Sequence, residues 1–250
     1  MKHEKQCGSA RGLEPFQLQL EQGLGELGVS LSHDDCCAVL DYLEAVLRAN
    51  ERLNLTRITA VDAAVRLHLL DSLSAMPELE AAPAGNVLDI GSGGGFPGVP
   101  LAIASRRRFV LLDSVAKKTV AVQSILDALD RDISASALWG RAEDVARESP
   151  GRFAAVVARA VTALPSLVEL ASPLLASGGR LIALKGRPSD AEVLSGVRVA
   201  GIVGMRSVGS RQLVLPGSDE LRSIVVYEKV GQGRVALPRR SGLAQHQPLA

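Results

Sequence analysis

Apolar residues recur at helical spacing in the first third of the chain. The clearest helix is predicted from about Asp34 to Arg52, with Ser32 as its N-terminal cap. Its apolar stripe consists of Val39, Leu40, Leu43, Val46 and Leu47. A second helix is predicted from about Ala60 to Ala75, before Pro77. We therefore expect residues 14–80 to form a helical cap, preceded by a disordered segment, residues 1–13.

Short apolar runs follow this cap, and helical segments separate them. The predicted strands are Val87–Ile90, Arg108–Asp113, Ile133–Leu138, Phe153–Arg159 and Gly179–Lys185. Helices are predicted between them over Lys117–Leu129 and Leu167–Leu175. Because strands and helices alternate, the pattern predicts an α/β fold with a parallel, doubly wound sheet.

The pattern changes in the last third of the chain. Strands are predicted over Val197–Val208, Gln212–Leu215 and Ser223–Val230, and only short turns separate the last two. This arrangement indicates an antiparallel edge, as in the common methyltransferase topology. The Pro-, Gly- and Arg-rich residues 231–250 are expected to form a mobile basic tail, so that the catalytic domain covers residues 81–230.

A glycine-rich turn, Gly91–Gly98, follows the first predicted strand. Glycine permits positive φ and lets a ligand lie against bare backbone, so this turn predicts a nucleotide-like cofactor at the start of the next helix. Gly93, Gly95 and Gly98 fit G-x-G-x-x-G, with Asp113 about twenty residues further on, which is the dinucleotide pattern. The same turn also fits a second pattern.

Read from Asp89, the turn fits D-x-G-x-G-x-G, the signature of S-adenosylmethionine-dependent methyltransferases. This interpretation is favoured because the glycine directly after the strand is Gly91, whose partner in the dinucleotide spacing is Phe96, which has a side chain. Asp89 also stands where a methyltransferase needs a carboxylate near the methionyl ammonium. The dinucleotide motif, moreover, usually begins its domain, and here about ninety residues precede it.

Polar residues at the ends of the later strands are candidates for chemistry, because open α/β sheets bind ligands at the carboxyl ends of their strands. Asp113 would accept two hydrogen bonds from a ribose diol. The segment Arg141–Asp144 follows the third strand, where an adenine ring would lie. Arg159 and Lys185 end the fourth and fifth strands, so both direct a cation into the same crevice.

Composition and charge indicate the cellular location of the protein and the kinds of ligand that it can bind. The 250 residues suffice for one substantial core, and no apolar run reaches the length of a membrane span. The polar N-terminus has no apolar signal core, and the three cysteines, two of them adjacent, have no metal-ligand spacing. We therefore expect a cytoplasmic protein without a metal site. The formal net charge is +1, so any nucleic acid would be bound by a local basic patch.

The residues at the end of the fourth predicted strand limit which kind of atom can accept the methyl group. Enzymes that methylate exocyclic amino groups commonly carry [D/N]-P-P-[Y/F] at this place, whereas this chain has Ala158–Val161. Methylation of pyrimidine C5 needs a cysteine nucleophile, and no cysteine lies near this strand. Methyl transfer to guanine N7 needs neither device, because N7 has an in-plane lone pair and no proton to remove. The absence of an obvious base is consistent with that reaction.

At this point the chain resembles a known family, the bacterial small-subunit ribosomal RNA guanine-N7 methyltransferase G, also called glucose-inhibited division protein B. The resemblance covers most of residues 30–245. Its motifs are Asn54-Leu55-Thr56, His68-Leu69-Leu70-Asp71-Ser72-Leu73, the turn from Asp89 to Gly98, Leu111-Leu112-Asp113-Ser114 with Lys117-Lys118, Gly140-Arg141-Ala142-Glu143, Ala158-Arg159-Ala160, Leu184-Lys185-Gly186 and the tail Leu237-Pro238-Arg239-Arg240-Ser241-Gly242. In this order and spacing the motifs are highly specific.

The resemblance implies a Rossmann-like seven-stranded methyltransferase sheet and transfer of a methyl group from S-adenosyl-L-methionine to N7 of a guanine in 16S ribosomal RNA. It implies a cofactor site made of Gly91, Gly93, Gly95, Phe96, Asp113, Ala142, Glu143 and Arg159. It also places Asn54, His68, Asp71 and Lys185 near the target base or the RNA backbone, and Arg159, Lys185, His68 and Asn54 are the candidates for a catalytic role. One departure is Leu67, where members often carry a basic residue.

Three alternatives stay open at this stage. A small-molecule methyltransferase of the same fold would not need Lys117, Lys118 or the basic tail. A non-catalytic module would bind S-adenosylmethionine or a dinucleotide and dock onto ribosomal RNA without turnover. A dehydrogenase would follow from the overlapping glycine pattern and would bind NADH tightly.

Overall fold

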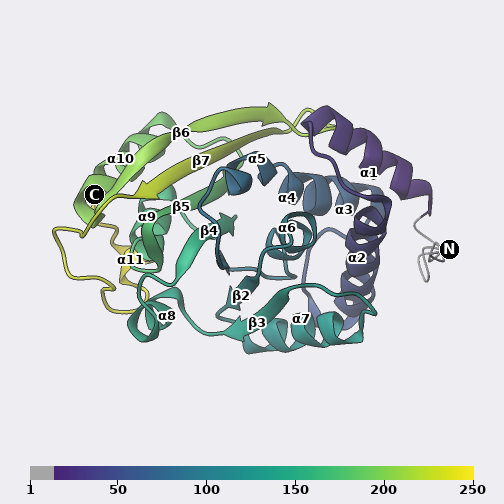
Figure 1. The fold of residues 1–250 in the computed structure, drawn as a ribbon, viewed down its shortest axis with the longest axis horizontal. Coiled ribbons are helices and arrows are strands. Elements are labelled where there is room, and N and C mark those ends of the chain that lie inside the picture. Colours follow the sequence, from purple (N-terminus) through teal and green to yellow (C-terminus); the bar gives the residue numbers. More distant parts are fainter. Residues whose placement is uncertain (1–13) are drawn as a thin grey trace.

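In residues 14–250, which the computed structural model describes, seven strands form one sheet in the order β3-β2-β1-β4-β5-β7-β6 (Figure 1). The strands are β1 (Val87–Ile90), β2 (Phe109–Asp113), β3 (Ala135–Trp139), β4 (Phe153–Arg159), β5 (Leu175–Lys185), β6 (Met205–Val214) and β7 (Leu221–Lys229). Strands β1 to β5 pair in parallel, and β7 lies antiparallel between β5 and β6. The predicted seven-stranded α/β sheet with an antiparallel edge is confirmed.

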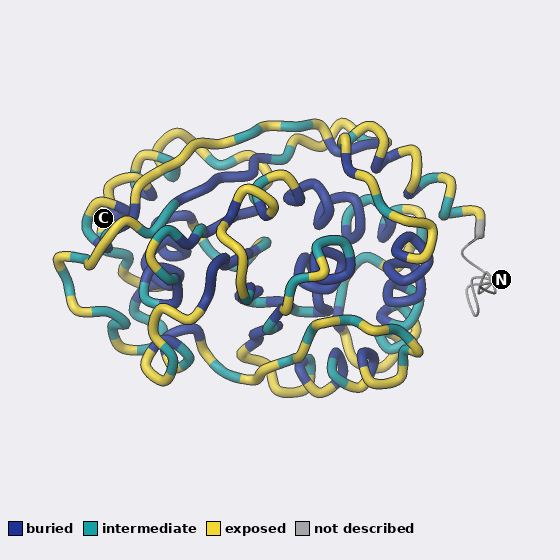
Figure 2. Tube along the Cα trace, in the orientation of Figure 1, coloured by how far each residue is buried: buried dark blue, intermediate teal, exposed yellow. Residues whose placement is uncertain are grey.

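Helices cover both faces of this sheet, and each face has its own hydrophobic core. Neighbouring residues of β4 show the division, because Ala155 and Val157 belong to one core and Val156 and Ala158 to the other. The helices are α1 (Glu14–Leu27), α2 (His33–Leu53), α3 (Val61–Ala64), the π-helix η1 (Val65–Leu70), α4 (Asp71–Leu73), α5 (Met76–Glu80), α6 (Gly98–Ser105), α7 (Ala116–Ala128), α8 (Ala142–Glu148), α9 (Leu164–Ala171), α10 (Asp190–Val203) and α11 (Leu243–His246). Figure 2 shows the central strands and the inward sides of these helices buried.

The N-terminal helices pack on one face of the sheet. Residues of α1, α2 and η1 share a core with Val87 of β1 and Phe109 of β2. The predicted long helix is confirmed as α2, where Ser32 caps the helix by accepting a hydrogen bond from the Asp35 amide at 3.1 Å. The predicted second helix is confirmed in position, although its middle, η1, has π-helical geometry. The cap and the sheet are therefore joined by one continuous core.

The predicted strand Val197–Val208 is wrong for its first part. Residues up to Val203 belong to α10, and β6 begins only at Met205. Ser189 caps α10 by accepting from the Glu192 amide, and Gly204, with φ 74°, ends it. The buried residues Gly196, Val199, Ala200 and Val203 recur at helical spacing. The predicted strand Gln212–Leu215 is the end of β6 rather than a separate strand.

Contrary to the prediction of a mobile tail, residues 231–250 pack against the sheet domain. Arg239 forms two hydrogen bonds to the carboxylate of Glu169 on α9, at 2.6 and 2.7 Å. Ala244 of α11 is only 2% exposed and joins the core on that face. Residues 231–250, which we call the C-terminal strap, are therefore ordered and lie across α8 and α9. The predicted disordered segment, residues 1–13, and Cys7 lie outside the described residues.

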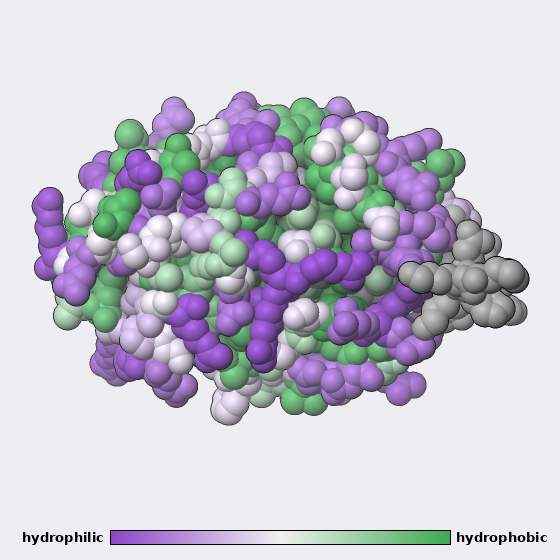
Figure 3. All heavy atoms as spheres, in the orientation of Figure 1, coloured by the Kyte–Doolittle hydropathy of each residue, from purple (hydrophilic) through white to green (hydrophobic). Residues whose placement is uncertain are grey.

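The surface is mainly hydrophilic on the face shown in Figure 3, where hydrophobic residues form small patches between charged and polar ones. Between residues 14 and 250, no helix combines the length and the apolar character that crossing a lipid bilayer requires.

Candidate functional site

The glycine-rich turn connects β1 to α6 and has the backbone conformation that only glycine adopts easily. Gly91, Gly93 and Gly95 have φ values of 71°, 56° and 83°. A Cβ on Gly91 would lie 2.6 Å from the Val161 side chain, and one on Gly95 would overlap the Tyr42 hydroxyl. A Cβ on Gly93, in contrast, would have no neighbour nearer than 4.0 Å. The turn is therefore packed underneath and open at Gly93.

Asp89 lies beneath this turn and has no exposed surface. Its Oδ2 atom accepts a hydrogen bond from the Gly98 amide at 2.8 Å, and within residues 14–250 its Oδ1 atom has no hydrogen-bond partner. Burial raises the pKa of Asp89 to about 7. The structure thus gives this carboxyl group a role in fixing the turn, and its contact with a methionyl ammonium stays a prediction.

Beside the turn lies a first hollow, which we call the Asp113 hollow. It is lined by Ile90, Gly91, Leu112, Asp113, Ser114, Gly140, Arg141, Ala142, Glu143, Val161, Leu170 and Gln245. Four of the predicted cofactor residues, Gly91, Asp113, Ala142 and Glu143, are therefore brought together here. The Asp113 carboxylate joins the end of β2 to the turn, because it accepts from the Gly93 amide at 2.9 Å and from the Val115 amide at 2.8 Å.

The C-terminal strap closes one side of the Asp113 hollow. The Gly242 amide donates a hydrogen bond of 2.7 Å to Oε1 of Glu143, and Gln245 lines the hollow. Arg147 of α8 further holds the strap by donating to the Arg239 carbonyl at 3.0 Å. Glu143 therefore contacts the strap and would also contact a ligand bound in the Asp113 hollow.

A second hollow, which we call the Arg159 hollow, lies on the other side of the end of β4. Its lining residues are Ile58, Leu67, His68, Asp71, Arg159, Ala160, Leu184, Lys185, Gly186, Glu220 and Arg222. Arg159 donates to Oδ2 of Asp71 at 3.0 Å and to the Leu67 carbonyl at 2.7 Å. Arg222 of β7 donates to Oδ1 of Asp71 at 2.9 Å. One buried carboxylate thus holds two arginines, and Glu220 also forms an ion pair with Arg222 at 2.7 Å, so the charges of these four side chains balance.

His68 joins this network to the glycine-rich turn. Its Nδ1 atom lies 3.2 Å from Nη2 of Arg159, and its Nε2 atom lies 2.7 Å from Oγ1 of Thr56. Its ring stacks on Phe96 at 4.5 Å between centroids and 7° between planes. Burial, together with the charge of Arg159, lowers the pKa of His68 to about 3. Phe96 is therefore a neighbour of the Arg159 hollow and does not line the Asp113 hollow.

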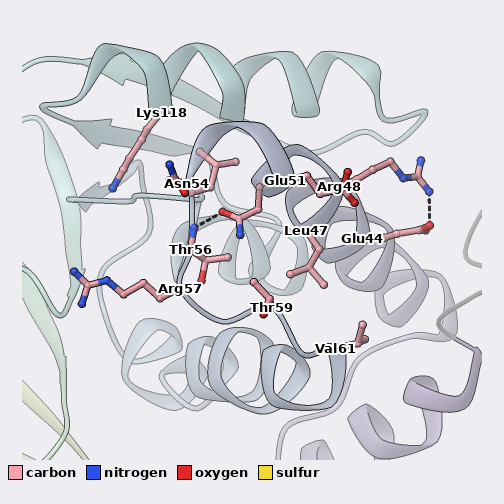
Figure 4. Close-up of a pocket in the computed structure, with 12 residues that line it drawn as sticks. Glu44, Leu47, Arg48, Glu51, Asn54, Thr56, Arg57, Thr59, Val61 and Lys118 are labelled. Atoms are coloured by element: carbon pink, nitrogen blue, oxygen red, sulfur yellow. Dashed lines mark hydrogen bonds and ion pairs between the residues drawn. The ribbon is translucent and has the colours of Figure 1, made fainter.

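Lys185 lies in the Arg159 hollow at the end of β5, as the strand-end pattern predicts. Its Nζ atom donates to the Thr162 carbonyl at 3.0 Å and forms an ion pair with Glu192 at 2.9 Å. The structure therefore brings His68, Arg159 and Lys185 to one hollow. Asn54, in contrast, ends α2 with φ 50° and lines a third hollow with Arg57 and Lys118 (Figure 4).

Three features of the site were not anticipated from the sequence. Arg222, Thr56 and the strap residue Gln245 reach the site from segments far from the glycine-rich turn. Thr56 belongs to the motif Asn54-Leu55-Thr56, so its place in that motif was the available signal. Arg222 and Gln245 stand in no motif, and their contacts depend on how the chain folds back.

Comparison with known proteins identifies the family. The family model described as GidB, rRNA small subunit methyltransferase G, matches residues 35–208. The Ribosomal RNA small subunit methyltransferase G of Deinococcus radiodurans is 40% identical over 235 residues, which cover 92% of this chain and 91% of that protein. The protein of the same name from Pelotomaculum thermopropionicum is 33% identical over 233 residues, 92% of this chain and 97% of that protein.

Among solved structures, the cofactor-bound Rv0187 from MTB superposes with a TM-score of 0.51 at 20% identity. The match covers 75% of this chain and 89% of that one, and it supports the fold alone. The family assignment rests on the sequence relatives and on the family model, whose matched residues 35–208 include the glycine-rich turn. On this evidence, the chain belongs to the rRNA small subunit methyltransferase G family.

Proposed function

We propose that this protein transfers the methyl group of S-adenosyl-L-methionine to N7 of a specific guanine in 16S ribosomal RNA, either free or in the small subunit, in the cytoplasm. The relatives' names support ribosomal RNA as the substrate. The observation that carries the proposal is the position of the glycine-rich turn and the end of β4, which lie between two hollows of different character. The Asp113 hollow, with a volume of about 70 Å³, has residue types that would hold part of a nucleoside cofactor. The Arg159 hollow brings together Arg159, Lys185 and Arg222, each paired with a carboxylate.

The residues of the Asp113 hollow fit the cofactor. A carboxylate has about four acceptor positions, and the two backbone amides bound to Asp113 use two of them, so two remain for a ribose diol. Gly93 is open to solvent space, which leaves its backbone free to approach a ligand. Ala142 and Glu143 begin α8 and would lie along the adenine ring. When bound, S-adenosyl-L-methionine supplies an electrophilic methyl group.

The Arg159 hollow would receive the guanine. Asp71 is held by two arginines and His68 by Arg159 and Thr56, so neither side chain is placed to remove a proton. N7 alkylation requires no proton removal, and the protein's contribution is then alignment of the base with the methyl group. Lys185, or an arginine of the network, would donate to the guanine O6 atom and leave the N7 lone pair free. His68, which stacks on Phe96, would form one wall.

The test uses labelled S-adenosyl-L-methionine with small subunits purified from cells that lack this protein. We expect the label to enter one guanine of 16S ribosomal RNA, and chain cleavage after alkaline depurination chemistry should map it to N7. Label in an exocyclic position would contradict the N7 assignment. Cofactor binding without label in subunits or free RNA would contradict the proposal and favour a small-molecule or non-catalytic role.

A further inference from the structure

The third hollow, which we call the Asn54 groove, is the largest of those described above, with a volume of about 1250 Å³. It lies between the end of α2, the loop that follows it and the start of α7 (Figure 4). Its lining residues are Glu44, Leu47, Arg48, Asn50, Glu51, Asn54, Leu55, Thr56, Arg57, Thr59, Val61 and Lys118. This volume exceeds the roughly 300–1000 Å³ of small-molecule pockets, and the polar lining suits an extended polar ligand.

The two ends of the groove differ in charge. Arg48 and Glu44 form an ion pair at one end, so their charges compensate each other. Figure 4 shows Lys118 and Arg57 extending toward the opposite side, with Asn54 between them. In the part of the chain that the structure describes, no carboxylate lies within ion-pair distance of Arg57 or Lys118, although Glu51 also lines the groove. This end of the groove therefore presents two uncompensated cations.

The groove is fixed directly beside the glycine-rich turn. Asn50 accepts a hydrogen bond from the Thr56 amide at 2.8 Å, which holds the loop, and the next residue back, Leu55, is buried. A Cβ on Gly94 would lie 3.6 Å from Leu55, so the floor of the groove packs on the turn. The Thr56 hydroxyl reaches His68 in the Arg159 hollow. One short loop thus separates the groove from the expected position of the target guanine.

We propose that the Asn54 groove binds a single-stranded segment of the RNA substrate next to the target guanine, an inference that rests on the proposed function. Arg57 and Lys118 contact the phosphodiester backbone, and the exposed amide of Asn54 contacts a base edge. Arg57 and Lys118 supply the sequence-independent part of the affinity, and Asn54 supplies a preference for certain bases. The ligand is recognised by its charge and its extended shape.

The test measures binding of a labelled single-stranded RNA of about 16 nucleotides and of intact small subunits. The variants are Arg57→Ala, Lys118→Ala, the double variant and Asn54→Gly. Glycine is chosen because Asn54 has φ 50°, which glycine adopts without strain. The matched control is Arg198→Ala, which removes an exposed arginine of α10 on the opposite face of the sheet.

We expect each cation variant to weaken RNA binding several-fold and to reduce the slope of log affinity against log salt by about 0.7. The double variant should lose about twice that slope, and the Arg198 control should match the wild type. Asn54→Gly should change the preference among RNA sequences while leaving the salt slope unchanged. Calorimetric affinity for S-adenosyl-L-methionine should stay the same in all variants.

A double variant that binds RNA like the Arg198 control would overturn the groove assignment, and so would a loss of cofactor affinity in parallel with RNA affinity. Wild-type protein is assayed for methyl transfer to small subunits alongside. If wild type methylates the subunits and the variants bind normally, only the groove assignment fails. If wild type transfers no methyl group, the proposed function itself fails.

Discussion

At the scale of single side chains, the contacts of His68 fix its protonation state. The guanidinium of Arg159 can only donate, so Nδ1 of His68 must be the acceptor and the ring proton must reside on Nε2. Nε2–H then donates to Oγ1 of Thr56, which also accepts from the Ile58 amide at 3.0 Å. His68 is thus a neutral ring that positions Thr56 and Phe96.

This assignment gives a spectroscopic prediction. Because the pKa of His68 is lowered to about 3, its ring nitrogens should keep the shifts of a neutral Nε2–H ring from pH 8 to pH 5 in ¹⁵N NMR spectra. Between pH 3 and 6.5 the unfolded state binds a proton that the folded state does not, so the free energy of unfolding should rise with pH there. Thr56→Ser serves as a control, because it keeps the hydroxyl that His68 contacts and should therefore leave the His68 shifts unchanged. Imidazolium shifts for His68 at pH 6 would contradict the assignment.

Asp89 should influence stability with the opposite sign. Its folded-state pKa of about 7 lies above the usual value of 3.8, so between pH 4 and 7 the folded state holds a proton that the unfolded state has lost. The contribution of Asp89 to the free energy of unfolding should therefore fall as pH rises through this window. Asp89→Asn removes the ionisation and retains an oxygen for the Gly98 amide. Urea unfolding of both proteins at several pH values gives the difference, and a difference independent of pH would refute this account.

At the scale of elements, the sequence predicted those helices and strands whose formation depends on neighbouring residues. The helix α2 was predicted correctly because its N-terminal cap and its apolar stripe both lie within one continuous segment of the chain. The strand β4, buried on both faces, was found as a continuous apolar run. The second half of α10 was predicted as a strand because Val197, Val199 and Val203 favour strands individually, whereas burial of Gly196 and Ala200 on the same side favours a helix. Packing of this kind depends on distant partners such as Tyr227, which lies against Gly196.

The strap gives a prediction at the same scale. Glu169 is 2% exposed and its carboxylate is bound by Arg239, so removing the arginine leaves a buried charge unpaired. Arg239→Ala should lower the free energy of unfolding by about 3 kcal/mol. The control, Arg240→Ala, removes an exposed neighbour for which no ion pair is found in residues 14–250 and should have an effect below about 0.5 kcal/mol. Equal effects of the two substitutions in urea titrations would show that the strap contact is not stabilising.

At the scale of the whole molecule, the helical cap and the sheet are one cooperative unit. The cap contributes Asp71, which binds Arg159 of β4 and Arg222 of β7, and it shares the core that contains Val87 and Phe109. The Arg159 hollow lies where these parts meet, because Ile58, Leu67, His68 and Asp71 of the cap line it together with ends of the strands. The sequence therefore predicted which residue types would form the site, including Asp113. It did not predict that Arg159 would line one hollow and Glu143 another, because that division depends on the tertiary arrangement.

Hydrogen exchange tests this cooperativity. The most protected amides of α2 and of β4 should exchange with the same free energy, close to that of global unfolding, because opening the cap would expose the core beneath it. The substitution Asp71→Ala removes the ion pairs to Arg159 and Arg222 but leaves the shared core. Protection of the amides in α2 and in β4 should therefore fall by the same amount. Fast exchange in α2 alongside full protection in β4 would show that the cap opens independently.

The strand order has a consequence for synthesis of the chain. β6 precedes β7 in the sequence, yet β7 takes the place beside β5, so for part of translation β6 has emerged while β7, with which it pairs, has not. β6 runs parallel to β5 and follows α10, so it could occupy the same edge first. β6 has mostly exposed positions, whereas β7 buries Ile224, Val225, Val226 and Tyr227. The polar character of β6 therefore keeps the edge of β5 vacant for the later strand, and it makes β6 a poor template for pairing between nascent chains.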